Sequence, residues 1–205
     1  MSLSLRLGAL FTSWGVVWVI YALSGLRGAD QAYHLTPWAI DAWFPFDPRA
    51  LWLYMSFFVL VLLAYLKGTA AWVAWLWRAV MICAVGAGAV YLVYPTTMDF
   101  PPVTQSGISA ELLKLLMAYD AVVNCAPSLH VALSLVSAVA LGATWRGWRG
   151  ALVWIWAVGI CLSILVLRRH QMADLLSGAV LAAVSAGLAP FLPLPRWLRA
   201  VSANA

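Results

Sequence analysis

Charged residues are scarce in this chain. Lys, Arg, Asp and Glu make up 9% of its 205 residues, whereas a soluble domain carries about 25%. Hydrophobic residues make up 65%, so a water-soluble fold is excluded because too few charges exist to cover its surface. Cysteine is also scarce: three cysteines do not make a disulfide framework, and Cys83 and Cys161 fall inside apolar runs.

The sequence contains several long apolar runs. A membrane-spanning helix needs about 20 apolar residues, whereas a membrane β-barrel needs segments of about ten residues with alternating polarity, which this sequence lacks. We therefore predict an all-α integral membrane protein, a six-helix bundle forming a single domain over 1–205. The predicted spans are about 7–26, 50–66, 72–94, 129–144, 150–167 and 173–193.

The first span resembles a secretory signal peptide in one respect. The sequence "ALSG", from Ala22 to Gly25, places small residues after an apolar stretch. The apolar stretch is long for the central region of a signal peptide, so we expect a retained first helix.

Basic residues collect on one side of the predicted bundle. The N-terminus, the even-numbered loops and the C-terminus carry seven basic residues and no acidic one, and the other side carries five basic residues and all seven carboxylates. Because Lys and Arg favour cytoplasmic loops, we predict a cell (inner) membrane protein with both termini cytoplasmic. The net charge of +5 then follows from topology and indicates no nucleic-acid partner. Tryptophans that mark the same boundary are Trp72, Trp75, Trp77, Trp145, Trp148 and Trp197.

The loop between the third and fourth spans, about 95–127, contains a helical pattern. Ile108, Leu112, Leu115 and Leu116 recur at helical spacing in "ISAELLKLLMAYDAVV". This spacing predicts an amphipathic helix that lies along the membrane interface. The same apolar face could instead pack on the bundle, and the pattern leaves both arrangements open.

Polar residues gather after the fifth span, in "LSILVLRRHQMADLLSG". His170 and Asp174 are four residues apart, so on a helix they would share a face. A carboxylate there can accept the imidazole Nδ1–H and leave Nε2 as a free lone pair, as in a base or a nucleophile. Arg168 and Arg169 stand just before His170, and two cations beside an oriented imidazole indicate a site for an anion such as phosphate.

A second polar cluster opens the fourth span, in "CAPSLHVALS". Pro127 and Ser128 predict a helix start, with Ser128 at or beside the N-cap. The free N–H groups and the positive dipole end of that helix would attract an anion. His130 would lie close to it and could protonate a departing oxygen. Both clusters fall on the same predicted side, facing the periplasm or the exterior.

Other interpretations of these residues stay open. A lone histidine or aspartate beside a span is more often an interfacial residue or a helix cap than catalytic, although ionisable groups are rare near these spans. The two histidines and Asp174 could bind a divalent ion, but the adjacent arginines oppose a cation, so neither a metal nor a cofactor is predicted. A transporter or a non-catalytic protein that binds anionic lipid is the other alternative; a transporter would place its polar groups at mid-membrane.

The two clusters resemble the second and third signature motifs of the type 2 phosphatidic acid phosphatase superfamily. They are most similar to the inositol phosphorylceramide synthase and sphingomyelin synthase-like branch, whose motifs read N-x-x-P-S-L-H and S-T-x-x-x-K-x-H-x-x-x-D-x-x-x-G. Trp43 to Phe58 and Tyr94 to Pro102 are also similar, so the resemblance extends over about 41–178, with its core motifs at 124–178. The matching residues are Asn124, Pro127, Ser128, Leu129, His130, Ser163, Arg168 in place of Lys, His170, Asp174 and the small pair Ser177 and Gly178.

The resemblance implies a metal-independent membrane enzyme that acts on a lipid-linked phosphate among membrane lipids. It implies that His170 attacks phosphorus to form a phosphohistidine, that Asp174 orients His170, and that His130 protonates the leaving group and then activates the acceptor. The acceptor would be water in a phosphatase and a lipid hydroxyl in a transferase. The phosphate-binding residues that it implies are Ser128 and Arg168, with Arg169 secondary.

The chain departs from the superfamily in its positive charges. The first motif, a Lys followed seven residues later by Arg-Pro, is absent, and Ile164 stands where the superfamily has Arg. Fewer cations favour a phosphodiester monoanion over a phosphomonoester dianion, because less charge must be held in the transition state. Arg27, Arg49 or Arg169 could replace the missing cations. The sequence carries no signal for an oligomeric state.

Overall fold

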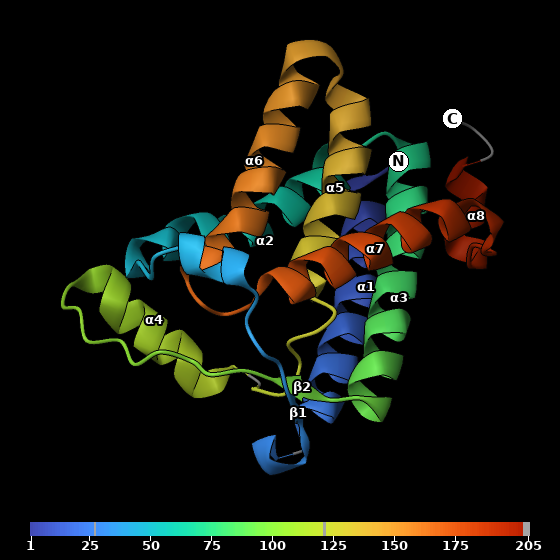
Figure 1. Ribbon diagram of the computed structural model, residues 1–205. Helices are drawn as coiled ribbons and strands as arrows, with labels where there is room; N and C mark the ends of the chain where they lie inside the picture. Colours follow the sequence, from blue (N-terminus) through green and yellow to red (C-terminus); the bar gives the residue numbers. More distant parts are fainter. Residues whose placement is uncertain (27, 121, 203–205) are drawn as a thin grey trace.

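Helices make up nearly all of the regular structure in the computed structural model, which describes residues 1–26, 28–120 and 122–202. The helices are α1 (Leu3–Ser24), α2 (Leu51–Lys67), α3 (Ala70–Val93), α4 (Ile108–Tyr119), α5 (Leu129–Trp145), α6 (Gly147–Val166), α7 (Met172–Leu188) and α8 (Arg196–Ser202). In Figure 1, α5 and α6 form a hairpin that projects at the top, α1 and α3 run side by side, and α4 lies apart from them. Single 3₁₀ turns cover Ala29–Gln31, Ala39–Trp43, Pro48–Ala50 and Ala189–Phe191.

Five of the described helical segments are long and apolar enough to cross a membrane, which makes the chain an integral membrane protein. The first begins earlier than predicted: Ser2 caps it through its side chain, and the Arg6 guanidinium donates to the carbonyls of Tyr65 and Gly68. A basic residue near the end of a span is thereby paired with backbone oxygens. The five segments are Leu3–Ser24, Pro48–Lys67, Ala70–Val93, Gly147–Val166 and Met172–Phe191.

The fourth predicted span forms α5, which has 17 residues and is shorter than those five segments. It is also the helix around which the bundle packs, because α2, α3, α6 and α7 all contact it. Most of its residues are buried, including Ala132, Val136 and Leu141. Protein rather than lipid surrounds α5, so its length need not match the bilayer in the way that a lipid-facing span must.

The connections between helices gather at two ends of the bundle. Near the start of α1, the Thr69 N–H donates to the Thr144 hydroxyl, which joins the α2–α3 connection to the end of α5. Near the end of α1, the Asn124 side chain donates to the Ser24 hydroxyl and so joins the segment before α5 to α1. The connections from α1 to α2, from α3 to α5 and from α6 to α7 therefore lie at the same end of the bundle, and this end holds the two polar clusters.

A short parallel strand pair, which the sequence pattern did not predict, ties these connections together. β1 (Tyr33–His34) pairs with β2 (Thr96–Thr97), with Tyr33 opposite Thr96, and Thr96 also bridges to Asn124. Two residues are too few to leave a periodic hydrophobic signal. The pair fixes the backbone of the long connections directly in front of α5.

α4 confirms the predicted helix in the connection between α3 and α5, and its packing shows which of its residues face the bundle. The residues that pack inward are Ala110 and Leu113, with Leu113 fully buried, whereas Ile108 and Leu115 are exposed. Leu116 packs between these two sides, against the cluster formed by α2, α6 and the loop before α2. α4 thus has apolar side chains on both its inner and its outer surfaces.

Gly178→Ala should destabilise the protein by about 1–3 kcal/mol, the usual cost of overpacking. A Cβ at this position would lie 2.5 Å from the Ser128 carbonyl oxygen, where α7 crosses the start of α5. Gly187, in the same helix, has nothing within 4 Å of its Cβ position, so Gly187→Ala should be neutral or stabilising by up to about 1 kcal/mol. Thermal unfolding in detergent micelles measures both variants, and equal melting temperatures would contradict the close approach.

Candidate active site

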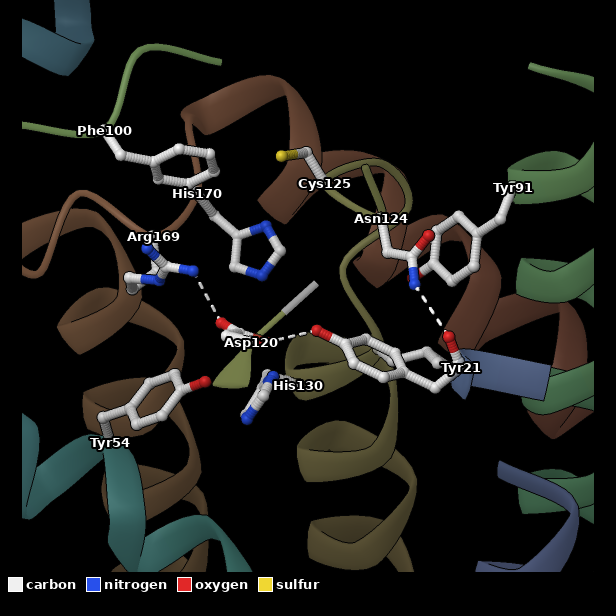
Figure 2. A pocket seen from close by; sticks show the side chains of 11 residues that line it. Tyr21, Tyr54, Tyr91, Phe100, Asp120, Asn124, Cys125, His130, Arg169 and His170 are labelled. Carbon is white, nitrogen blue, oxygen red and sulfur yellow. Dashed lines mark hydrogen bonds and ion pairs between the residues drawn. The ribbon is translucent and has the colours of Figure 1, made fainter. Parts of the chain in front are cut away.

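The two polar clusters meet at one cavity beside the start of α5 (Figure 2). Its volume is about 20 Å³, which is enough for about one water molecule. α1, α2, α3, the segment before α5, α5 itself and the turn before α7 all contribute side chains. The lining residues are Tyr21, Tyr54, Tyr91, Phe100, Asp120, Asn124, Cys125, Leu129, His130, Arg169 and His170.

His170 is held by Asp174, as predicted, although the local structure differs. The Nδ1 atom of His170 lies 3.2 Å from Oδ2 of the fully buried Asp174. His170 is not on a helix, because α7 begins at Met172 and Gln171 is its extended N-cap. The same Asp174 oxygen accepts the Gln171 N–H at 2.9 Å. One carboxylate therefore caps α7 and orients the imidazole, which leaves Nε2 of His170 turned to the cavity as the free nitrogen.

His130 lies in the first turn of α5, directly across the cavity from His170. The two ring centroids are 6.4 Å apart. The His130 ring stacks on Tyr54, with centroids 4.5 Å apart, and packs against Phe57 at 4.7 Å. These two rings come from α2 and fix the plane of the imidazole.

Ser128 is the N-cap of α5, as predicted, and its hydroxyl accepts the Val131 N–H at 3.4 Å. Its own N–H donates to the Asp174 carbonyl at 3.2 Å. Ser128 is fully buried and is not one of the residues that line the cavity. Its observed role is to start α5 and to tie that helix to α7.

The two consecutive arginines take different positions, in the reverse of the order that the resemblance implies. Arg169 is buried and lines the cavity, with its guanidinium carbon 4.4 Å from the centre of the Phe100 ring. Arg168 adopts a left-handed backbone conformation (φ 50°) and is not among the lining residues. The turn between α6 and α7 directs neighbouring side chains apart, so Arg169 is the cation at the site.

Asp120 and Tyr21 complete the site, and neither was predicted. Nη2 of Arg169 donates to Oδ2 of Asp120 at 2.7 Å, and the Tyr21 hydroxyl donates to Oδ1. Burial raises the pKa of Asp120, but Arg169 and Tyr21 lower it by more, so it lies below its ordinary value. Asp120 follows α4, 49 residues from Arg169 and 99 from Tyr21. No local pattern could reveal contacts at such separations.

Arg49, another cation considered from the sequence, does not line the cavity. Arg49 is exposed and forms an ion pair with Asp47 at 2.7 Å, and Arg27 lies outside the described residues. The Tyr94–Pro102 segment contributes Phe100, an aromatic ring, rather than a cation. Ser163 donates to the Ile160 carbonyl within α6 and is not a lining residue.

An apolar groove of about 220 Å³ leads to the same site from between α1 and α2. It shares Tyr21, Tyr54, Asp120, Leu129 and His130 with the polar cavity. The rest of its lining is apolar and includes the exposed Trp18. The remaining lining residues are Trp14, Val17, Phe57, Phe58, Leu116 and Leu133.

Cys125 lines the polar cavity as a protonated thiol. Burial raises its pKa to about 12, so at neutral pH it lacks the thiolate that nucleophilic chemistry requires. Within the described ranges, no group of three or more His, Cys, Asp or Glu side chains is placed to hold a metal ion. Comparison of the chain with protein-family models, curated proteins and solved structures gave no match.

Arg169→Gln should destabilise the protein by about 3–5 kcal/mol, because it leaves the carboxylate of Asp120 buried without its partner. The side chains of Arg169 and Asp120 are only 4% and 16% exposed. The double variant Asp120→Asn/Arg169→Gln should lose less than the sum of the two single losses. Thermal unfolding of the four proteins at pH 7 gives the coupling energy, and additive losses would contradict a buried pair.

The same coupling should weaken in acid. Because the folded protein lowers the pKa of Asp120, the pair stabilises the fold fully above the ordinary carboxyl range, about pH 4. That contribution is lost as the pH falls through the lowered pKa. Repeating the four measurements at decreasing pH checks this, and a coupling energy that stays constant in acid would argue against an ionised Asp120.

Proposed function

We propose that this protein is a metal-independent membrane enzyme that cleaves a lipid-linked phosphate ester through a phosphohistidine and passes the phosphoryl or phospho-headgroup to an acceptor. The observation that carries the proposal is the pair of histidines facing each other across a cavity that also contains Arg169. The resemblance of the 124–178 residues to the type 2 phosphatidic acid phosphatase superfamily supports it.

The geometry suits a displacement at phosphorus. Reacting atoms in a productive complex are about 3 Å apart on each side, and a separation of 6.4 Å between the ring centroids would leave room for a phosphorus atom between the two imidazoles. The cavity must widen to admit a phosphoryl group, because its present volume suits about one water molecule. α4, which carries Asp120 at its C-terminal end, contacts mainly α2 and the 3₁₀ turn Pro48–Ala50 and lies apart from α1 and α3 (Figure 1).

The reaction runs in two steps. The Nε2 lone pair of His170 attacks phosphorus, the bond from phosphorus to the lipid oxygen breaks, and His130 donates a proton to that oxygen. His130 then takes a proton from the acceptor hydroxyl, whose oxygen attacks phosphorus and releases His170. Asp174 stabilises the positive charge that develops on His170, and Arg169 holds a non-bridging phosphate oxygen.

The apolar groove supports a lipid as the substrate. Its lining from α1, α2 and α5 offers almost no polar group apart from Asp120 and the tips of the shared residues, and it ends at His130. A lipid whose chain lay between α1 and α2 would place its phosphate at the histidines. Burial of each methylene contributes about 0.8 kcal/mol, so the chain supplies affinity while the polar cavity supplies the chemistry.

Charge at the site supports a phosphodiester donor. Arg169 is the single guanidinium among the described lining residues, whereas a phosphomonoester dianion needs more neutralisation in its transition state. The donor is then a lipid with a headgroup, and the acceptor is a lipid hydroxyl or water.

The proposal places α5 as a sixth span, with both termini cytoplasmic and the site at the outer leaflet. The bias of Lys and Arg toward the N-terminus, even-numbered connections and C-terminus supports this orientation. The gathering of the odd-numbered connections at the end that holds the site is consistent with it.

His170→Ala should lower the rate of diacylglycerol release from phospholipids by about 10⁴-fold or more, because the nucleophile is lost. His130→Ala should lower the rate by about 10²–10⁴-fold through loss of the general acid. The assay supplies phosphatidate and several headgroup-bearing glycerophospholipids in metal-free micelles, with and without a long-chain alcohol, and follows diacylglycerol by mass spectrometry.

His34→Ala is the matched control, because His34 is exposed and pairs with Asp99 away from the cavity. It should retain wild-type turnover. No turnover of any donor by the wild-type protein, together with equal lipid binding by wild type and His170→Ala, would favour the non-catalytic alternative of an anionic-lipid-binding protein.

Val17→Trp should raise KM for a donor with 16-carbon chains about tenfold and leave that for a four-carbon donor unchanged. Val17 is buried in the lining of the groove, and an indole there would occupy the space of several methylenes. Val158→Trp, on the exposed surface of α6, is the control. An equal rise in KM for both donors would argue against the groove as the chain-binding site.

A further inference from the structure

Asp120 lies where the polar cavity and the apolar groove join, and it lines both. Among the described residues that line either space, it is the only carboxylate. Its position is fixed by two donors, the Arg169 guanidinium and the Tyr21 hydroxyl. A phosphate held between His130 and His170 would therefore bind next to a fixed negative charge.

The charge of Asp120 offsets that of Arg169 before any substrate binds. Apart from the imidazoles, these two residues carry the formal charges of the cavity lining, and they sum to zero. Repulsion between Asp120 and a bound phosphate scales with the product of their charges, so it is twice as large for a dianion as for a monoanion. Burial keeps this difference from being screened by salt.

Arg169 retains donors for the substrate while it holds Asp120. Its Nη2 bonds to Asp120, but its Nε is buried and has no hydrogen-bond partner within the described residues. The Phe100 ring covers a guanidinium face, and the in-plane Nε–H is among the donors that remain for a ligand. Because Asp120 already takes part of the guanidinium's charge, the remainder suits a monoanion better than a dianion.

We propose that Asp120 is a specificity-determining residue, which excludes dianionic phosphomonoesters from the site by sharing Arg169 with the bound phosphate. This inference rests on the proposed function and adds to it the residue that selects the charge of the substrate. Asp120 does not react; it acts through Arg169 and through its own charge.

Two amphiphiles without any ester bond test the proposal at pH 9 in detergent micelles. Dodecylphosphonate carries mostly two negative charges, and dodecyl(methyl)phosphinate carries one, while their chains are identical. Titration calorimetry gives the dissociation constant of each for the wild-type protein, Asp120→Asn and Glu111→Gln. Glu111 is the matched control, because it is an exposed carboxylate on α4, paired with Lys114.

The wild-type protein should bind the phosphinate at least about tenfold more tightly than the phosphonate. Asp120→Asn should bring the ratio to one or reverse it, and Glu111→Gln should keep the wild-type ratio. A merely structural role of Asp120 would weaken both ligands alike and leave the ratio unchanged, which would overturn the proposal. If Asp120→Asn does not fold, equal or tighter binding of the phosphonate by the wild type overturns it without the variant.

These outcomes separate this inference from the proposed function. An unchanged ratio together with His170-dependent turnover removes only the role of Asp120. If neither amphiphile binds and no His170-dependent turnover occurs, the proposed function fails as well.

Discussion

The carboxylate and carbonyl of one buried residue, Asp174, join the parts of the molecule on which the site depends. The side chain caps α7 through the Gln171 N–H and contacts His170 Nδ1, while the backbone carbonyl accepts the Ser128 N–H at the start of α5. Gly178, one turn further along, allows α7 to lie against the Ser128 carbonyl. The separation of the two histidines therefore follows from the contact between two helix N-termini, and each histidine needs that contact to face the other.

The sequence predicts the parts of this arrangement that rest on local chemistry. Ser128 as a helix cap and the contact between His170 and Asp174 follow from spacing and capping preference, and the structure confirms both. The long apolar segments follow from composition, and five of the six predicted spans meet the length of a membrane-crossing helix. α5, with 17 residues, falls short of the length used to recognise a membrane-crossing helix. Its apolar residues pack against the helices that surround it, so length is a weaker guide for this helix than for one in contact with lipid.

Features that depend on distant contacts could not be predicted. Arg169 lines the cavity and Arg168 does not, because the turn before α7 has a left-handed backbone conformation at Arg168. Two adjacent arginines in a sequence give no signal of which side chain points inward. Asp120 is an ordinary acidic residue at the end of a predicted helix until Tyr21 and Arg169 are brought to it. The inward face of α4 could not be chosen from the sequence for a related reason: apolar residues lie on both of its sides, so periodicity alone cannot choose between Leu113 and Leu115.

The Tyr21–Asp120–Arg169 chain of contacts has a consequence for biogenesis. It joins the first helix to the turn before α7, and the Gln171 side chain reaches the Leu35 carbonyl across 136 residues of sequence. During synthesis the early helices enter the membrane long before α7 is available, so the cavity cannot assemble piece by piece. The cavity is complete only when the last long helix is present, and a chain truncated before residue 170 would lack both His170 and the Asp174 carboxylate that holds it.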